Sequence, residues 1–190
     1  NPRYQQVIAL TRRSWVQEHS KFVNFVTDFK DLEKVLAPYH VDDVFCCLGT
    51  TIAKAGSKDK FREVDFTYPL ALAKATLPLG ATQYLLVSAL GADKSSSIFY
   101  NRVKGQVEEA ISAEPFSAIH IFRPSLLLGP REEKRAGEEA AKVLYKYLGF
   151  LIPEKYKGIQ GSTVAKAMQE MAGRESSGVF VHESQEMQRM

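Results

Sequence analysis

Three residues in the middle of the chain have the types and spacing of an acid/base site. Tyr100 and Lys104 are four residues apart in a helix-like segment, so one helical turn stacks their side chains. A phenol ordinarily titrates near pH ~10, and a neighbouring ammonium favours its ionised form, which suits proton exchange near neutrality. Ser88, at the end of the preceding strand-like run, can donate a hydrogen bond to the same substrate carbonyl. The spacing alone is weak evidence, because chance readily produces Tyr-x-x-x-Lys pairs in a chain with 8 tyrosines.

The segments that must position these residues alternate between strand and helix. Apolar runs rich in β-forming residues predict strands over residues 5–10, 21–26, 42–49, 82–88 and 116–124. Helical patterns lie between them, over residues 31–36, over residues 58–77 with a bend or interruption near Pro69, and around Tyr100. This alternation predicts an α/β fold with a doubly wound parallel sheet, in which helices cover both faces and the crossovers are right-handed.

The composition predicts a single soluble domain. The chain has 190 residues, of which 45% are hydrophobic, and no apolar run reaches the ~18 to 20 residues that a membrane span requires. No secretory signal is visible, so we expect a cytoplasmic protein without a membrane partner. A net charge of +3 is too small and too dispersed to indicate nucleic-acid binding.

The two cysteines, Cys46 and Cys47, are adjacent in a predicted core strand. Successive side chains in a strand point to opposite faces, so this pair is poorly placed to form a disulfide. Burial as small apolar side chains is the simpler interpretation, and no metal site is expected.

Six segments together resemble one protein family. They are LTRR, VTDF, FCCLGTT, KAGSKDKFREVDFTYPL, LLVSALGADKSSSIFYNRVKGQVE and FRPSLLLGPRE, in the family's order as far as Glu132. The chain is similar to the atypical short-chain dehydrogenase/reductases, which have an NAD(P)-binding Rossmann fold, and within them to the Tat-interacting oxidoreductase group and its bacterial epimerase-like relatives. The resemblance implies one NAD(P)-binding domain over residues 1–190, to which residues 125–190 contribute a small substrate-side lobe.

The resemblance also implies roles for the central residues. Ser88, Tyr100 and Lys104 match the family's Ser-Tyr-Lys set, in which Tyr exchanges the proton, Lys also contacts the nicotinamide ribose, and Ser polarises the substrate carbonyl. Arg12 and Arg13 follow the strand after which a guanidinium can bind the adenosine 2′-phosphate. Because no acidic residue stands there, NADP(H) is favoured, with NAD(H) possible; ordinary surface arginines are the alternative.

Further cofactor contacts follow from the same resemblance. Asp28 matches an aspartate near the adenine amine, Leu48, Gly49 and Thr50 form a close approach to the cofactor, and Pro124 borders the nicotinamide. Structural alternatives remain for two of them. Asp28 can begin a helix, and Pro124 can simply end a strand.

The chain departs from the family pattern in two ways. Asp65 stands where many relatives have an Asn that supports a proton relay, and a carboxylate does not replace that amide donor. The family fold also opens with a strand and a glycine-rich turn that binds the pyrophosphate, whereas this chain opens at NPRYQQVIALTRR. We expect roughly 20 to 25 residues to precede this opening, none of the phosphate-binding glycines to lie in this sequence, and a slot between the strands predicted over 5–10 and 42–49.

These observations predict an NADP(H)-dependent oxidoreductase that acts on a small carbonyl or alcohol substrate. The main alternative is an NADP(H)-binding regulatory or scaffold protein with little turnover. A nucleotide-sugar epimerase is disfavoured, because only about sixty residues follow Gly129 to form a substrate domain. Within them, an apolar stripe formed by Val143, Leu144, Tyr147 and Leu148 either walls a pocket or packs in the core. The sequence leaves the choice between monomer and homodimer open.

Overall fold

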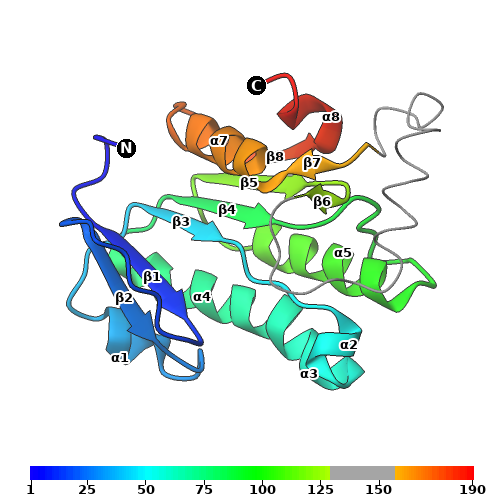
Figure 1. The fold of residues 1–190 in the computed structure, drawn as a ribbon, viewed down its shortest axis with the longest axis horizontal. Helices are drawn as coiled ribbons and strands as arrows, with labels where there is room; N and C mark the ends of the chain where they lie inside the picture. Colours follow the sequence, from blue (N-terminus) through cyan, green and yellow to red (C-terminus); the bar gives the residue numbers. More distant parts are fainter. Residues whose placement is uncertain (129–156) are drawn as a thin grey trace.

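A computed structural model describes residues 1–128 and 157–190 of the protein. The strands are all parallel, and helices lie on both sides of the sheet (Figure 1). This arrangement confirms the predicted doubly wound α/β fold. The strands are β1 (Val7–Thr11), β2 (Phe22–Val26), β3 (Asp43–Cys46), β4 (Gln83–Val87), β5 (Ala118–Arg123), β6 (Leu127–Leu128), β7 (Ile159–Gln160) and β8 (Gly178–Glu183).

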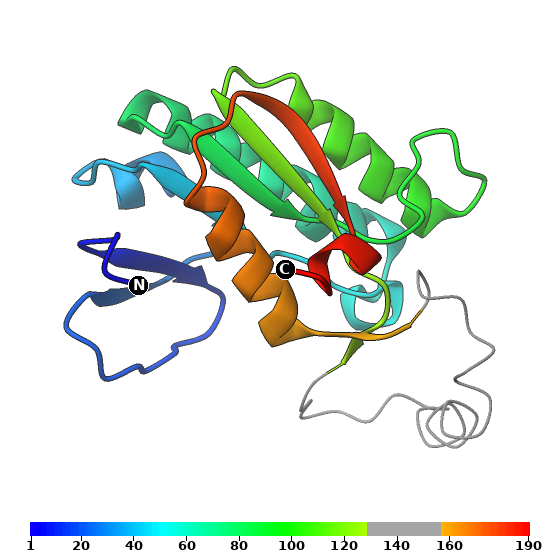
Figure 2. The ribbon, with the colours of Figure 1, turned by 90° about the horizontal axis from the view of Figure 1, so that it is seen from above.

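Helices connect these strands and form the two outer layers. They are α1 (Leu32–Leu36), α2 (Ile52–Ala55), α3 (Lys58–Arg62), the π-helix η1 (Glu63–Thr67), α4 (Tyr68–Thr76), the 3-10 helix η2 (Leu77–Leu79), α5 (Phe99–Ser112), α7 (Gly161–Ala172) and α8 (Ser184–Met187). Seen from above, α7 crosses one face of the sheet while α4 and α5 lie beneath the other (Figure 2). No described helix is long and apolar enough to cross a bilayer.

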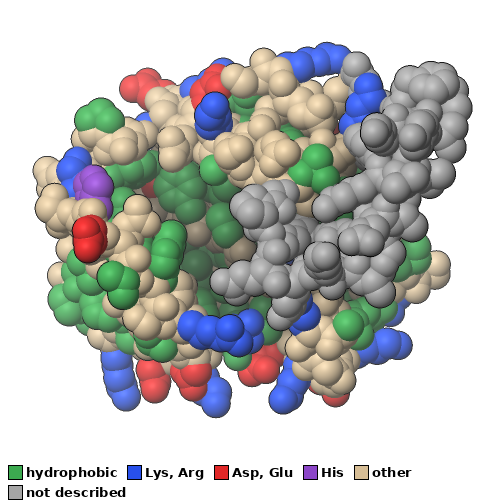
Figure 3. All heavy atoms as spheres, viewed as in Figure 1, with side chains coloured by type: hydrophobic (Ala, Val, Ile, Leu, Met, Phe, Trp, Pro, Cys, Tyr) green, Lys and Arg blue, Asp and Glu red, His purple; other side chains and the backbone are tan. Residues whose placement is uncertain are grey.

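The main sheet is divided into two parts. β1 pairs with β2, β3 begins a separate sheet of order β3-β4-β5-β8, and no strand of the described ranges lies between β1 and β3. Val7 of β1 and Phe45 of β3 remain 46% and 37% exposed. Figure 3 shows a hollow with apolar side chains in this part of the molecule. The gap matches the slot that the sequence predicts.

Two apolar clusters hold the sheet to its helices, one on each face. Leu86 of β4 packs in the cluster with α1, α4 and α5, whereas its neighbour Leu85 packs in the cluster with α7 and α8. This alternation follows from the two-residue period of a strand. Both leucines are buried, and each such side chain contributes about 1.5 to 3 kcal/mol by leaving water.

The segment over residues 58–77, which the sequence predicts as a helix bent or interrupted near Pro69, is interrupted and forms four consecutive helical pieces. Its interruption is the π-helix η1, where the N–H of Tyr68 bonds the carbonyl of Glu63 five residues earlier. Pro69 has no N–H to donate to the carbonyl of Asp65, so regular helical bonding stops one turn before the proline and not at it. The predicted stripe at residues 143–148 lies outside the described residues.

Candidate functional site

The predicted site residues gather at one edge of the sheet because they follow parallel strands. Arg12 and Arg13 follow β1, Asp28 follows β2, and Ser88 and Pro124 follow β4 and β5. The carboxyl ends of parallel strands lie at the same edge, and open α/β sheets bind their ligands there. The predicted residues Leu48, Gly49 and Thr50 come just beyond β3 at this edge.

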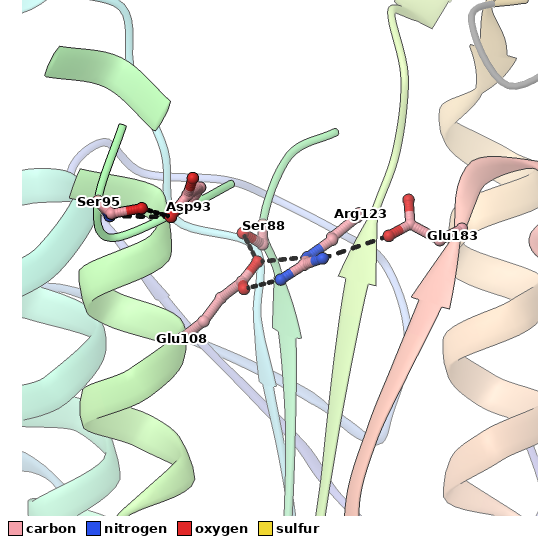
Figure 4. Close-up of polar contacts among 6 residues, drawn as sticks. All are labelled: Ser88, Asp93, Ser95, Glu108, Arg123 and Glu183. Atoms are coloured by element: carbon pink, nitrogen blue, oxygen red, sulfur yellow. Dashed lines mark hydrogen bonds and ion pairs between the residues drawn. The ribbon is translucent and has the colours of Figure 1, made fainter. Parts of the chain in front are cut away.

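A close contact fixes the loop that connects Ser88 with α5. A Cβ on Gly105 would lie 2.1 Å from the backbone nitrogen of Lys94 and 2.3 Å from the carbonyl carbon of Asp93. Only glycine allows the loop to approach the helix this closely. Asp93 accepts hydrogen bonds from both the N–H and the hydroxyl of Ser95, which closes the turn beside α5 (Figure 4).

Lys104 forms a buried ion pair with Asp65. Its Nζ lies 2.8 Å from Oδ1 of Asp65, and these two side chains are 5% and 0% exposed. The other carboxylate oxygen of Asp65 accepts the Thr50 N–H at 2.9 Å. Burial raises the pKa of the Asp65 carboxyl, while Lys104 and the Thr50 N–H act in the opposite direction.

Ser88 is also engaged within the protein. Its Oγ donates to Oε1 of Glu108 at 2.5 Å, and its backbone N–H donates to the carbonyl of Phe122. The Arg123 guanidinium donates two hydrogen bonds to the same carboxylate, with Nε 3.0 Å from Oε1 and NH2 2.5 Å from Oε2 (Figure 4). On its other side Arg123 lies 3.3 Å from Glu183, and the hydrogen bonds that Arg123 donates to Glu108 are the largest cause of its raised pKa. A hydroxyl has one proton, so Ser88 in this state presents only lone pairs to a ligand.

Tyr100 is half-buried near the start of α5, and its ring packs 5.5 Å from that of Phe61. Lys104 lies one turn further along the same helix. The structure thus brings Tyr100, Lys104 and Ser88 to one end of the sheet, with Lys104 and Ser88 each held by an acidic partner.

The arginines and Asp28 lie on the surface. Arg12 and Arg13 are exposed, and the Arg13 carbonyl accepts a hydrogen bond from Thr11. Asp28 is exposed too, and its carboxylate accepts the N–H of Lys30. This bond closes a turn around Phe29, whose φ is +64°. Helix α1 begins only at Leu32 with Asp31 as its N-cap, so Asp28 is not a helix-initiating residue.

Gly49, another predicted cofactor contact, lies beside the Lys104–Asp65 pair. A Cβ on Gly49 would lie 3.5 Å from Oδ1 of Asp65 and 3.7 Å from Nζ of Lys104, which are ordinary contact distances. The fold itself therefore does not require glycine at this position. Pro124 is buried, and its carbonyl accepts the N–H of Leu90, so it also helps to hold the loop before α5.

Glu108 and Arg123 are site residues that the sequence reasoning missed. Glu108 is four residues after Lys104, so the helical spacing that linked Tyr100 to Lys104 extends to a third chemical side chain. Arg123 is the last residue of β5 and directly precedes Pro124. The helical spacing and the strand-end position could therefore have indicated each residue separately, but nothing in the sequence indicates that the two form a pair.

A curated relative decides the family. Protein HTATIP2 of Rattus norvegicus is 37% identical over 171 residues, which cover 87% of this chain and 69% of that protein. The chain belongs to the HTATIP2 family of atypical short-chain dehydrogenase/reductases. Its membership confirms the resemblance seen in the six sequence segments. No protein-family model matches the chain.

Fungal relatives of the HTATIP2 family correct the predicted location. The mitochondrial protein fmp52 of Emericella nidulans is 41% identical over 102 residues, which cover 54% of this chain and 44% of that protein. Relatives from several other fungi are also named mitochondrial, which contradicts the expectation of a cytoplasmic protein. The composition of a folded domain does not encode its location, because targeting depends on separate signals. The chain spans less than half of the fmp52 protein's length.

Solved structures share the fold of this HTATIP2-family chain at low sequence identity. The Bordetella bronchiseptica enzyme WbmG, solved in complex with NAD, has a TM-score of 0.67 and 13% identity, and covers 96% of this chain and 66% of its own. RMD from Pseudomonas aeruginosa, solved in complex with NADPH, has a TM-score of 0.60 and 14% identity, and covers 85% of this chain and 68% of its own. These likenesses establish the Rossmann-type fold and nothing finer.

Proposed function

We propose that the protein is an NADP(H)-dependent oxidoreductase in which Tyr100 exchanges a proton with a carbonyl or alcohol substrate. The observation that carries the proposal is the placement of these residues: Ser88 follows β4 at the carboxyl edge of the sheet, and α5, which carries Tyr100 and Lys104, is tied through Asp65 to the loop after β3 at the same edge. Family membership supports this assignment, and nicotinamide dinucleotides in matched folds support the cofactor.

The residues at this edge suit a dinucleotide. Arg12 and Arg13 offer exposed guanidinium groups beyond β1, where a forked contact to a 2′-phosphate favours NADP(H) over NAD(H). The exposed backbone at Gly49 lies next to the Lys104 ammonium, whose donors suit ribose hydroxyls. When bound, the nicotinamide supplies or accepts the hydride.

Proton transfer falls to the side chains of this chain. Tyr100 gives its proton to the carbonyl oxygen during reduction and takes the hydroxyl proton during oxidation. Ser88 donates to the same oxygen only after its hydroxyl turns away from Glu108. Glu108 then keeps its two hydrogen bonds from Arg123, so the buried carboxylate stays paired while Ser88 is used.

A second candidate is an NADP(H)-binding regulatory protein with little turnover. The observation that favours it is that polar groups of the site already have partners within the protein: Lys104 is paired with Asp65, and Ser88 donates its hydroxyl proton to Glu108. An enzyme needs the Ser88 hydroxyl to turn towards a substrate, whereas a cofactor sensor does not.

Turnover separates the two candidates. The protein is assayed with NADPH against a panel of aldehydes and ketones, and with NADP⁺ against the corresponding alcohols. The enzyme proposal predicts turnover, and a Tyr100→Phe variant should lose at least about a hundredfold in kcat while it still binds NADPH. Turnover that survives in Tyr100→Phe would refute the role of Tyr100. Cofactor binding without turnover across the panel would favour the regulatory protein.

A further inference from the structure

The acidic partner of Lys104 is built into the interior of the site. Asp65 has a fully buried side chain, and both of its carboxylate oxygens point at groups of the site. One oxygen lies against the Lys104 ammonium, and the other accepts the N–H of Thr50 in the loop that follows β3. The carboxylate therefore connects the helix that carries Tyr100 with the loop that we propose to border the cofactor.

The packing of the helices aims Asp65 at Lys104. Phe61 of α3 packs against Tyr100, and four residues later Asp65 reaches Lys104, which is four residues beyond Tyr100. The two helical segments therefore meet in register over one turn. Asp65 lies in the π-helix η1, a rare element in which one turn is widened. Its direction is set by this packing and does not depend on a surface contact.

We infer that Asp65 is a positioning residue that holds the Lys104 amine in place and couples it to the loop at Thr50. The inference rests on the proposed function and gives Asp65 a role other than the amide relay of its relatives. An ammonium has three N–H donors, so the contact with Asp65 leaves two for a ligand. Without the carboxylate, a buried amine at this position would lose its partner and its orientation.

The first test uses the ligand-free protein. Burial and ion pairing slow the exchange of ammonium protons with water, so Lys104 should give a protected side-chain signal in ¹⁵N-resolved NMR spectra, absent from Lys104→Met. Asp65→Asn should lose this signal, and Asp65→Glu should retain it. Asp59→Asn, which removes an exposed carboxylate from α3, is the matched control and should leave the signal unchanged.

The second test measures NADPH affinity by calorimetry. Asp65→Asn should weaken binding about tenfold, which is the size expected when a charged hydrogen-bonding group loses its orientation. Asp65→Glu should stay within about threefold of the wild type, and Asp59→Asn should equal it. Rescue by the glutamate separates a need for the carboxylate from a general loss of packing.

The two tests distinguish a failure of the proposed function from a failure of the inference about Asp65. A wild-type protein that binds no dinucleotide would count against the proposed function, while the ligand-free NMR signal would still decide the role of Asp65. The inference is overturned if the wild type has no protected Lys104 signal, or if Asp65→Asn keeps both the signal and the affinity. If Asp65→Asn does not fold, the wild-type NMR spectrum still tests the inference, because the absence of a protected Lys104 signal would refute it.

Discussion

Helix α5 carries two buried ions one turn apart, and their surroundings differ. Lys104 is paired with Asp65 inside the protein, where the side chains are 5% and 0% exposed. Glu108 is paired with Arg123, which is 26% exposed and also contacts Glu183 at the surface. The first pair, which we call sealed, is almost completely buried, and the second, which we call open, is exposed to water through Arg123.

The difference shows how one helix can combine a fixed charge with an adjustable one. A sealed pair that loses a partner leaves an unpaired and poorly hydrated ion, which strongly destabilises the fold. An open pair can exchange a partner for water or for a ligand at a lower cost. Lys104 therefore suits a permanent position, whereas the Glu108–Arg123 pair can release Ser88 to a substrate.

Removal of the sealed partner should have the largest effect. Asp65→Ala leaves the Lys104 amine without its counterion and should lower the free energy of unfolding by about 3 to 5 kcal/mol. Arg123→Ala should cost less, because water can approach the open pair. Urea denaturation measures both variants. An equal or larger loss for Arg123→Ala would break the distinction between the two pairs.

A substitution between the two ions should have the next largest effect. Gly105 lies directly after Lys104, and a Cβ there would collide with the backbone of Lys94 and Asp93. Gly105→Ala should therefore cost roughly 2 to 3 kcal/mol in thermal or urea unfolding. Gly161→Ala is the matched control, because a Cβ at that helical glycine meets nothing within 4 Å. If the two variants were equally stable, the close approach of the loop would not exist.

A buried pair of histidines extends the comparison to pH. His120 and His182 lie 3.1 Å apart between β5 and β8, and Glu186 of α8 contacts His182. Burial, and then His182, lower the pKa of His120 from 6.5 to about 4. The unfolded chain therefore binds more protons between these values, so stability should fall as the pH drops from 6.5 to 4, by about 2 kcal/mol.

This pH dependence can be isolated by variants. The unfolding free energy of the wild type should depend more steeply on pH in this range than that of His120→Gln. His19→Gln, which changes an exposed histidine, should keep the wild-type slope. Equal slopes in the wild type and His120→Gln would show that His120 is not kept neutral by the fold.

The smallest effect is expected at the outer end of the open pair. Glu183 is 49% exposed and lies 3.3 Å from Arg123. Glu183→Gln should change the unfolding free energy by less than about 0.5 kcal/mol, because water replaces an exposed partner. A loss of several kcal/mol in urea denaturation would mean that Glu183 belongs to a sealed network.

The parts of this structure that the sequence predicts are those governed by local periodicity. The apolar run that ends at Ser88 forms β4, and the spacing of Tyr100 and Lys104 places both on α5. Their approach to the same edge follows from the parallel topology. The split between β1 and β3 also agrees with the slot expected between the strands over 5–10 and 42–49.

The ion pairs could not be predicted, because they depend on contacts across different elements. The direction of Asp65 depends on a π-turn, and helical periodicity at 3.6 residues per turn does not reveal a local five-residue bond. Glu108 and Arg123 are 15 residues apart and meet only when β5 lies beside α5. Sequence alone thus gives the candidate acid/base residues but not the partners that control them.

The most direct test of this account is a calorimetric titration of the protein with NADPH and, in parallel, with NADH. NADPH should bind at least about tenfold more tightly, because the exposed guanidinium groups of Arg12 and Arg13 would contact its 2′-phosphate. Failure to bind either dinucleotide, or a preference for NADH, would contradict it.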